Sequence, residues 1–185
     1  MTEAEEPGVA LLLIDVIDSL NEDDSRDLIA AARLAAPKIL ALRERAHESG
    51  VPVIYVNHGV AQNDPTAFPE ASADGDVVTR MLAPTERDYS VVKLRASGFE
   101  ETELQSLLDQ VKARTVVLAG FTTDDTLLPT ASDAHARGYG VVVPTDCTAA
   151  KSDARAQLAF SRMRLEAGAL TRDSQTIDLR ALRYA

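Results

Sequence analysis

The sequence contains little cysteine, no long hydrophobic run and no excess of positive charge. Cys147 is the only cysteine among 185 residues, which excludes a disulfide within the chain and is typical of a reducing compartment. The net charge of −10 argues against nucleic acid or an anionic membrane as the main partner. No apolar run is long enough to span a bilayer, and no cationic stretch precedes the first apolar run. We therefore expect a cytoplasmic protein without a signal peptide, a nucleic-acid partner or a membrane partner.

What the chain does contain is the composition of an ordinary soluble domain. Hydrophobic residues make up 45% of the sequence and charged residues 26%, as in typical globular proteins. The length suits one domain with a real hydrophobic core. Because no internal repeat or boundary is visible, we predict a single domain over residues 1–185.

Apolar, β-rich segments alternate with segments of helical spacing. The predicted strands are 9–14, 51–56, 89–92, 114–119, 140–144 and a short final one that begins at 169–170. The predicted helices are 25–49, 99–111, one that ends near 137, and 152–166. Pro37 is expected to kink or interrupt the first of them. The alternation predicts an α/β fold with a mainly parallel sheet covered by helices.

In such sheets, ligands bind beyond the carboxyl ends of the strands. The residues at these ends are Asp15, Asn57, His58, Lys93, Gly120, Phe121, Thr122, Thr145 and Asp146. Residues 59–87, rich in Pro, Asp, Ala and Gly, are long for a simple connection, so we expect a lid or an interface segment there.

Two of these strand ends carry opposite charges. Asp15 ends an apolar strand, where a carboxylate costs free energy unless it is paired or hydrogen-bonded, and Lys93 follows another short apolar strand. An Asp and a Lys that converge can tune each other and hold a proton for transfer. A purely structural ion pair is the alternative, because such pairs also perturb ionisable groups.

A series of short motifs follows nearly the whole chain in order: Leu11-Leu12-Leu13-Ile14-Asp15, Ala83-Pro84, Lys93 with Ser97, Phe99 and Leu104, Gly120-Phe121-x-Thr123, Thr130-Ala131-x-Asp133-Ala134, Gly138-Tyr139 and Thr145-Asp146. In these motifs the chain resembles the isochorismatase-like superfamily, also called the cysteine hydrolases. The resemblance implies a Rossmann-like three-layer sandwich, frequent oligomerisation, and an Asp–Lys–Cys site that hydrolyses amides, nitriles or related small molecules.

By this resemblance Asp15 and Lys93 match the catalytic Asp and Lys, but Thr126 stands on the position of the cysteine. Phe121-Thr122 falls on a peptide bond that is often cis in the family, and its expected use is to aim backbone N–H groups at an oxyanion. The backbone part of the site could persist although the thiol is absent.

Thr126 itself is one alternative nucleophile. A threonine hydroxyl needs an adjacent base, and Asp15 is a weak one beside the positive charge of Lys93. Cys147 is not a replacement by motif, since a single buried cysteine is usually a packing residue.

The family also offers a precedent without a thiol. Its isochorismatase members lack the cysteine and are thought to hydrolyse an enol ether through acid catalysis by the Asp. Isochorismate is a dianion, however, and Asp124 and Asp125 would repel it unless their side chains turn away. At a helix N-terminus, such residues are normally caps or dipole partners.

A metal site is not expected. The nicotinamidase-like branch of the family carries several histidines after the second strand, whereas only His58 stands there in this chain. A metal site needs three or more convergent ligands, so His58 is predicted to line the pocket or to hydrogen-bond the chain. No phosphate loop or dinucleotide fingerprint is present, and we expect no cofactor.

The leading hypothesis is therefore a hydrolase of a small organic molecule, with water as the nucleophile. Asp15 and Lys93 provide acid–base catalysis, the Thr126 hydroxyl orients water or substrate, and the predicted substrate-binding residues are His58, Phe121, Thr122 and Asp125. The alternatives are a catalytically silent binding or scaffold protein and an amidase that uses Thr126. A small molecule is the expected partner, together with further copies of the chain in a homodimer or larger homo-oligomer.

Overall fold

The computed structural model describes residues 8–17, 26–59 and 77–184. Its strands are β1 (Gly8–Ile14), β2 (Val53–His58), β3 (Tyr89–Lys93), β4 (Ala113–Phe121), β5 (Gly140–Pro144), β6 (Thr148–Ala149) and β7 (Leu170–Arg172). Its α-helices are α1 (Arg26–Glu48), α2 (Val77–Met81), α3 (Leu104–Gln110), α4 (Leu128–Ala136) and α5 (Asp153–Ala167). A π-helical turn, η1 (Thr123–Leu127), precedes α4, and three 3-10 turns are η2 (Thr145–Cys147), η3 (Ser174–Thr176) and η4 (Ala181–Tyr184).

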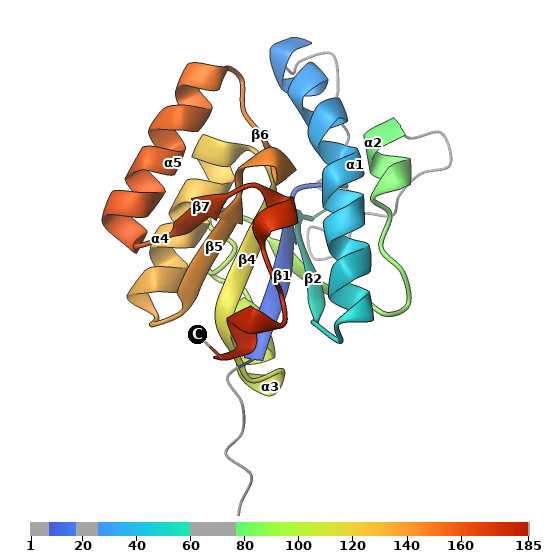
Figure 1. The fold of residues 1–185 in the computed structure, drawn as a ribbon, viewed down its shortest axis with the longest axis vertical. Coiled ribbons are helices and arrows are strands. Elements are labelled where there is room, and N and C mark those ends of the chain that lie inside the picture. Colours follow the sequence, from blue (N-terminus) through green and yellow to red (C-terminus); the bar gives the residue numbers. More distant parts are fainter. Residues whose placement is uncertain (1–7, 18–25, 60–76, 185) are drawn as a thin grey trace, which may run out of the picture.

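The strands form one sheet in the order β3-β2-β1-β4-β5-β7, and β6 pairs with β4 beyond its end. Every strand pair in this sheet is parallel. In Figure 1 the sheet runs through the middle of the molecule, with α1 and α2 on one side and α4 and α5 on the other. The predicted α/β sandwich with a mainly parallel sheet is confirmed.

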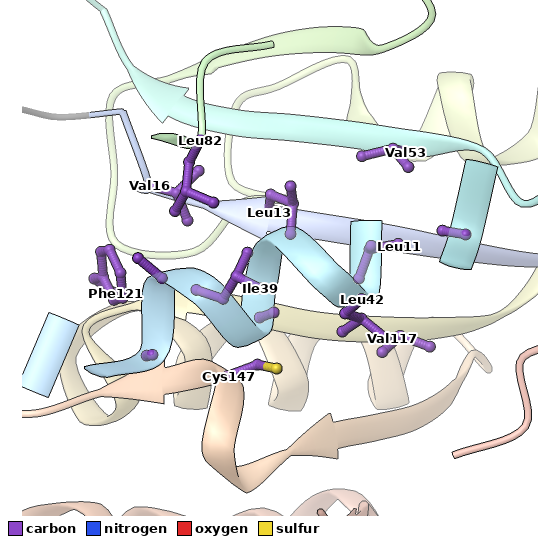
Figure 2. Packing of buried hydrophobic residues seen from close by; sticks show 14 of the residues in the cluster. Leu11, Leu13, Val16, Ile39, Leu42, Val53, Leu82, Val117, Phe121 and Cys147 are labelled. Carbon is purple, nitrogen blue, oxygen red and sulfur yellow. The ribbon is translucent and has the colours of Figure 1, made fainter. Parts of the chain in front are cut away.

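The central strand β1 buries both of its faces, as the unbroken apolar run predicts. Leu11 and Leu13 pack into the cluster that contains α1, whereas Leu12 and Ile14 pack into the cluster that contains α3, α4 and α5. Figure 2 shows the first cluster, where the side chains of β1 meet Ile39 of α1. Because both faces of β1 are packed, the position of its carboxyl end, which carries part of the candidate site, is fixed within the sheet.

Pro37 was expected to kink or interrupt the first helix, and the interruption is wrong: α1 continues through Pro37. The ring is exposed, so the Arg33 carbonyl that loses its intrahelical partner lies on the side that faces water. The helix expected from Phe99 begins only at Leu104. Thr102 donates a hydrogen bond to the Gly98 carbonyl at 2.6 Å, and this side-chain turn replaces the first helical turn.

A buried arginine fixes the segment that leads into β3. Arg43 of α1 donates hydrogen bonds of 2.8 Å to the Tyr55 hydroxyl and to the Ala83 carbonyl. Tyr55 in turn donates to the Leu82 carbonyl at 2.7 Å. Burial raises the pKa of Tyr55 to about 12, so its hydroxyl keeps the proton that it donates.

The predicted lid or interface segment lies mostly outside the described residues, and α2 occupies the part that the structure does describe. Within the described ranges, no helix is long and apolar enough to cross a membrane.

Candidate active site

Three predicted site residues meet where neighbouring strands end. Asp15 directly follows β1, His58 ends β2, and Lys93 ends β3. Ile14 pairs with Val56 and His58 pairs with Lys93 in the parallel ladders. Because the strands are adjacent and in register, their last side chains reach the same edge of the sheet, as the sequence predicts.

Asp15 and Lys93 form a buried ion pair. The Lys93 Nζ atom lies 2.8 Å from Asp15 Oδ2, and the two side chains are 0% and 9% exposed. Lys93 also donates to the Arg95 carbonyl at 3.2 Å. A buried ammonium without such partners would carry a large desolvation cost. Asp15 itself has a left-handed backbone, with φ of 53°, and its N–H donates to the Val56 carbonyl at 3.0 Å.

His58 joins this pair from the solvent side. Its Nδ1 atom is 3.1 Å from Asp15 Oδ1, and its side chain is 45% exposed. The Lys93 Nζ atom lies 3.2 Å from Nδ1 and 3.4 Å from Nε2 of the same ring. The prediction that His58 lines the site agrees with this position, and its link to both Asp15 and Lys93 was not foreseen.

Gly120 allows β4 to approach the backbone of β1 beside Asp15. Its φ is 131°, and a Cβ atom would lie 2.0 Å from the Ile14 carbonyl oxygen. No side chain fits at this position without moving the strand that carries Asp15.

Thr126 lies in η1, and its hydroxyl is turned toward the backbone. Its Oγ1 atom lies 2.8 Å from the Phe121 carbonyl and 2.9 Å from the Thr122 carbonyl. A hydroxyl has a single proton, so that proton is directed to a carbonyl and not to a base. The Thr126 N–H also donates to the Thr122 carbonyl, at 3.2 Å.

The Phe121–Thr122 peptide bond is cis, as the resemblance led us to expect. The Phe121 side chain is 3% exposed and belongs to the core cluster around α1 (Figure 2), so only its backbone remains available to a ligand. Thr122 Oγ1 accepts a hydrogen bond from the Asp125 N–H at 3.3 Å. The N–H groups of Asp125 and Thr126 are thus engaged inside the turn.

Asp125, predicted to bind substrate, forms ion pairs with residues at the start of α5. Its carboxylate pairs with Arg155 at 3.0 Å and with Lys151 at 3.5 Å, and Asp124 also pairs with Arg155. These partners lie at the start of α5, where Ser152 caps the helix. The expected repulsion of an anionic substrate is therefore weakened, because both acidic residues are paired with cations.

Two further strand-end residues have structural roles. Cys147 is buried in the core (Figure 2), and burial raises the pKa of its thiol to about 12. Asp146 accepts hydrogen bonds from the N–H and hydroxyl of Ser174, at 2.8 and 2.9 Å, and pairs with Lys38 at 3.4 Å. Asp146 therefore ties the C-terminal segment to α1.

A hydrogen-bond chain that the sequence analysis overlooked links the two halves of the site. The Gly98 N–H donates to Thr130 Oγ1 at 3.0 Å, and Thr130 donates to the Thr126 carbonyl at 2.7 Å. Ser97 donates to Asp133 at 2.5 Å. The segment after Lys93 is thereby fastened to α4 and to η1. The only signal was the pair of hydroxyl and carboxylate residues at helical spacing in α4.

Other candidate groups lie away from the Asp15–Lys93 pair. Phe99 stacks on Tyr139, with ring centroids 5.9 Å apart. Among the residues that the structure describes, no group of three or more His, Cys, Asp or Glu side chains converges as a metal site would require.

Comparison with known proteins gives a consistent result. The family model for the Isochorismatase domain matches residues 9–175. An isochorismatase family protein of Bacillus subtilis is 32% identical, over 83% of this chain and 87% of that protein. A protein of Arabidopsis thaliana described as a probable inactive nicotinamidase is 27% identical, over 77% of this chain and 81% of that one. The solved N-carbamoylsarcosine amidase of Thermoplasma acidophilum superposes with a TM-score of 0.75 and 28% identity, over 92% of this chain and 99% of that one.

Proposed function

The chain belongs to the isochorismatase family, and we propose that it hydrolyses a small organic molecule with Asp15 as the acid–base residue, water as the nucleophile and no thiol. One observation carries the proposal: the carboxylate of Asp15 is held 2.8 Å from an ammonium that is completely shielded from solvent. Burying this ion pair costs desolvation free energy, and a role in acid–base catalysis would explain why the pair is present despite that cost.

The surroundings of Thr126 favour water as the nucleophile. The hydroxyl proton is directed to the Phe121 or Thr122 carbonyl, so Asp15 does not take it in this arrangement. Covalent catalysis by threonine needs an adjacent base. Thr126 can still orient water through the lone pairs of its oxygen.

The substrate class that we favour is a small amide, imine or enol ether. The N-carbamoylsarcosine amidase that shares the fold is an example of an amidase. Because Asp124 and Asp125 are paired with Arg155, a negatively charged substrate meets less repulsion than the sequence suggests, which keeps anionic enol ethers in this set.

A catalytically silent binding protein is the second candidate. It is supported by the loss of the nucleophile and by the structural hydrogen bonds of the Thr126 hydroxyl. One relative at 27% identity is described as probably inactive. In that case the Asp15–Lys93 pair serves folding alone.

A hydrolysis screen separates the two candidates. Purified protein is incubated with panels of small amides, imines and enol ethers, and products are followed by mass spectrometry for the wild type, Asp15→Asn and Thr126→Ala. We expect turnover by the wild type, loss of turnover in Asp15→Asn and only a reduction in Thr126→Ala. Ligand binding without turnover by any of the three proteins would support the silent protein instead.

The Thr126→Cys variant is the matched control. Amidase activity gained with this single change would demonstrate that the rest of the machinery is intact. If Thr126→Ala were as inactive as Asp15→Asn, and a covalent adduct formed on Thr126, the water mechanism would be wrong.

A further inference from the structure

His58 is the solvent-facing member of the acid–base cluster. The side chains of Lys93 and Asp15 are 0% and 9% exposed, whereas that of His58 is 45% exposed. A hydrolytic turnover needs one proton removed from water and one delivered to the leaving group. In this cluster the imidazole connects the shielded carboxylate with the solvent.

The distances indicate which ring nitrogen carries the proton. Lys93 Nζ is 3.2 Å from Nδ1 and 3.4 Å from Nε2, so its distances do not distinguish the two ring nitrogens. Asp15 Oδ1, in contrast, lies 3.1 Å from Nδ1. A carboxylate is an acceptor and needs a donor at this distance. Nδ1 therefore carries the proton, and Nε2 is left as the basic nitrogen.

We propose that His58 is a second acid–base residue, which relays a proton from the attacking water to Asp15; the proposal rests on the proposed hydrolytic function. The water oxygen forms a bond to the electrophilic substrate atom while one water proton passes to Nε2. The Nδ1 proton passes to Asp15 Oδ1, and Asp15 protonates the leaving group as its bond to the substrate breaks and the electron pair leaves with it. Water is added across the broken bond, and exchange of the exposed ring with solvent restores the starting tautomer.

The relay also gives Lys93 a defined part. Its ammonium stays 2.8 Å from Asp15 Oδ2, so the proton arrives at the other carboxylate oxygen, Oδ1. The positive charge beside Oδ2 favours the ionised carboxylate and so favours onward transfer of the proton to the leaving group. Asp15 is thereby reset to the carboxylate that accepts the Nδ1 proton in the next turnover.

The tautomer can be measured without a substrate. Nitrogen-15 NMR of the full chain with labelled histidine distinguishes Nδ1–H from Nε2–H, and His58→Gln identifies the His58 signals. We expect the Nδ1–H tautomer in the wild type and its loss in Asp15→Asn. An Nε2–H tautomer in the wild type would overturn the proposal, because Nδ1 would then be an acceptor and would have no proton to pass to Asp15 Oδ1.

Kinetics then distinguish proton transfer from mere positioning of Asp15. His58→Asn offers an amide donor near the place of Nδ1 but has no basic nitrogen, whereas His58→Gly opens space for added imidazole. On the amide, imine or enol ether that the wild type hydrolyses, we expect kcat to fall about 100-fold in both variants, with partial rescue of His58→Gly by imidazole. Full activity of His58→Asn would overturn the relay.

The same assay separates this proposal from the hydrolytic function on which it rests. An inactive Asp15→Asn beside a fully active His58→Asn overturns the relay and leaves the proposed function standing. Turnover that survives in Asp15→Asn overturns the proposed function itself.

Discussion

The ammonium of Lys93 is completely shielded from solvent and lies 2.8 Å from the carboxylate of Asp15. The two residues are far apart in sequence and come from strands that are separated by β2. Their contact therefore reports on both the register of the sheet and the integrity of the site.

Removing one partner of this pair is expected to destabilise the protein. Asp15→Asn leaves a buried ammonium without its counter-charge, which typically costs about 3–5 kcal/mol, and urea unfolding measures the loss. The double variant Asp15→Asn with Lys93→Met removes both charges and should recover much of the stability, but no activity. Equal stability of the wild type and Asp15→Asn would contradict a buried ion pair.

Gly120→Ala is expected to be more disruptive than Gly138→Ala. Both glycines have positive φ, of 131° and 86°, but the added Cβ would lie 2.0 Å from the Ile14 carbonyl at Gly120 and within 4 Å of nothing at Gly138. The left-handed backbone alone costs about 1–2 kcal/mol, so Gly138→Ala should lose about that much. Gly120→Ala should lose clearly more, as measured by thermal unfolding; similar losses would argue against the close contact.

Asp146 is expected to make stability depend on acid pH. Burial alone would raise the pKa of this carboxyl, but hydrogen bonds from Ser174, its own N–H and Lys38 outweigh burial and lower it below the usual 3.8. A group with a lowered pKa stabilises the fold above the unfolded-state value and loses that contribution as pH falls through the folded-state value. Asp146→Asn should therefore cost about 1–3 kcal/mol at pH 7.

The difference between the wild type and Asp146→Asn should shrink below pH 3.8, where the wild-type carboxyl also becomes protonated. Unfolding curves at several pH values check the trend. Ser174→Ala serves as a control, because it removes the hydroxyl donor and keeps the N–H donor. A difference that stays constant with pH would rule out the carboxylate as its source.

The single native thiol is expected to be unreactive in the folded protein. Cys147 is buried, and burial raises the pKa of its thiol to about 12, so the nucleophilic thiolate is scarce at neutral pH. Iodoacetamide should leave the wild type unlabelled until it is unfolded. Thr126→Cys should take up one label per chain, located by peptide mass spectrometry.

Replacing Thr126 tests whether its hydroxyl holds the turn together. Thr126→Val keeps the shape but removes the hydrogen bond to the Phe121 or Thr122 carbonyl, which should cost about 1 kcal/mol. Thr126→Ser keeps the hydroxyl and should be closer to the wild type in thermal unfolding. Identical melting of Thr126→Val and the wild type would mean that the hydroxyl contributes nothing to stability.

The sequence predicts the strands and the convergence of Asp15, His58 and Lys93 because periodic burial and parallel pairing determine them. The sequence does not predict which hydrogen-bond and ion-pair partners the polar side chains bind. Asp146 binds Ser174 and Asp125 binds Arg155, and neither pairing follows from spacing. The effect of Pro37 was also not predictable from the sequence. The helix continues through this proline, whose ring is exposed to solvent in the structure.

The direction of the Thr126 hydroxyl was equally hidden. A threonine at this position is compatible with a nucleophile, a water ligand or an inert residue, and the carbonyls of Phe121 and Thr122 within 2.9 Å argue only against the nucleophile. This hydrogen-bond geometry depends on the π-helical turn and does not follow from residue type.

The ion pair and the turn with Thr126 are attached to different strands. Asp15 follows β1 and Lys93 ends β3, whereas η1 follows β4. A change at the nucleophile position therefore need not dismantle the charged pair. In evolutionary terms, a substitution at position 126 can change the residue of the turn while the buried pair of Asp15 and Lys93 stays in place. For an engineer, this placement makes Thr126 a position to vary while Asp15 and Lys93 are kept, provided that the hydrogen bonds from Gly98 through Thr130 to the Thr126 carbonyl are retained.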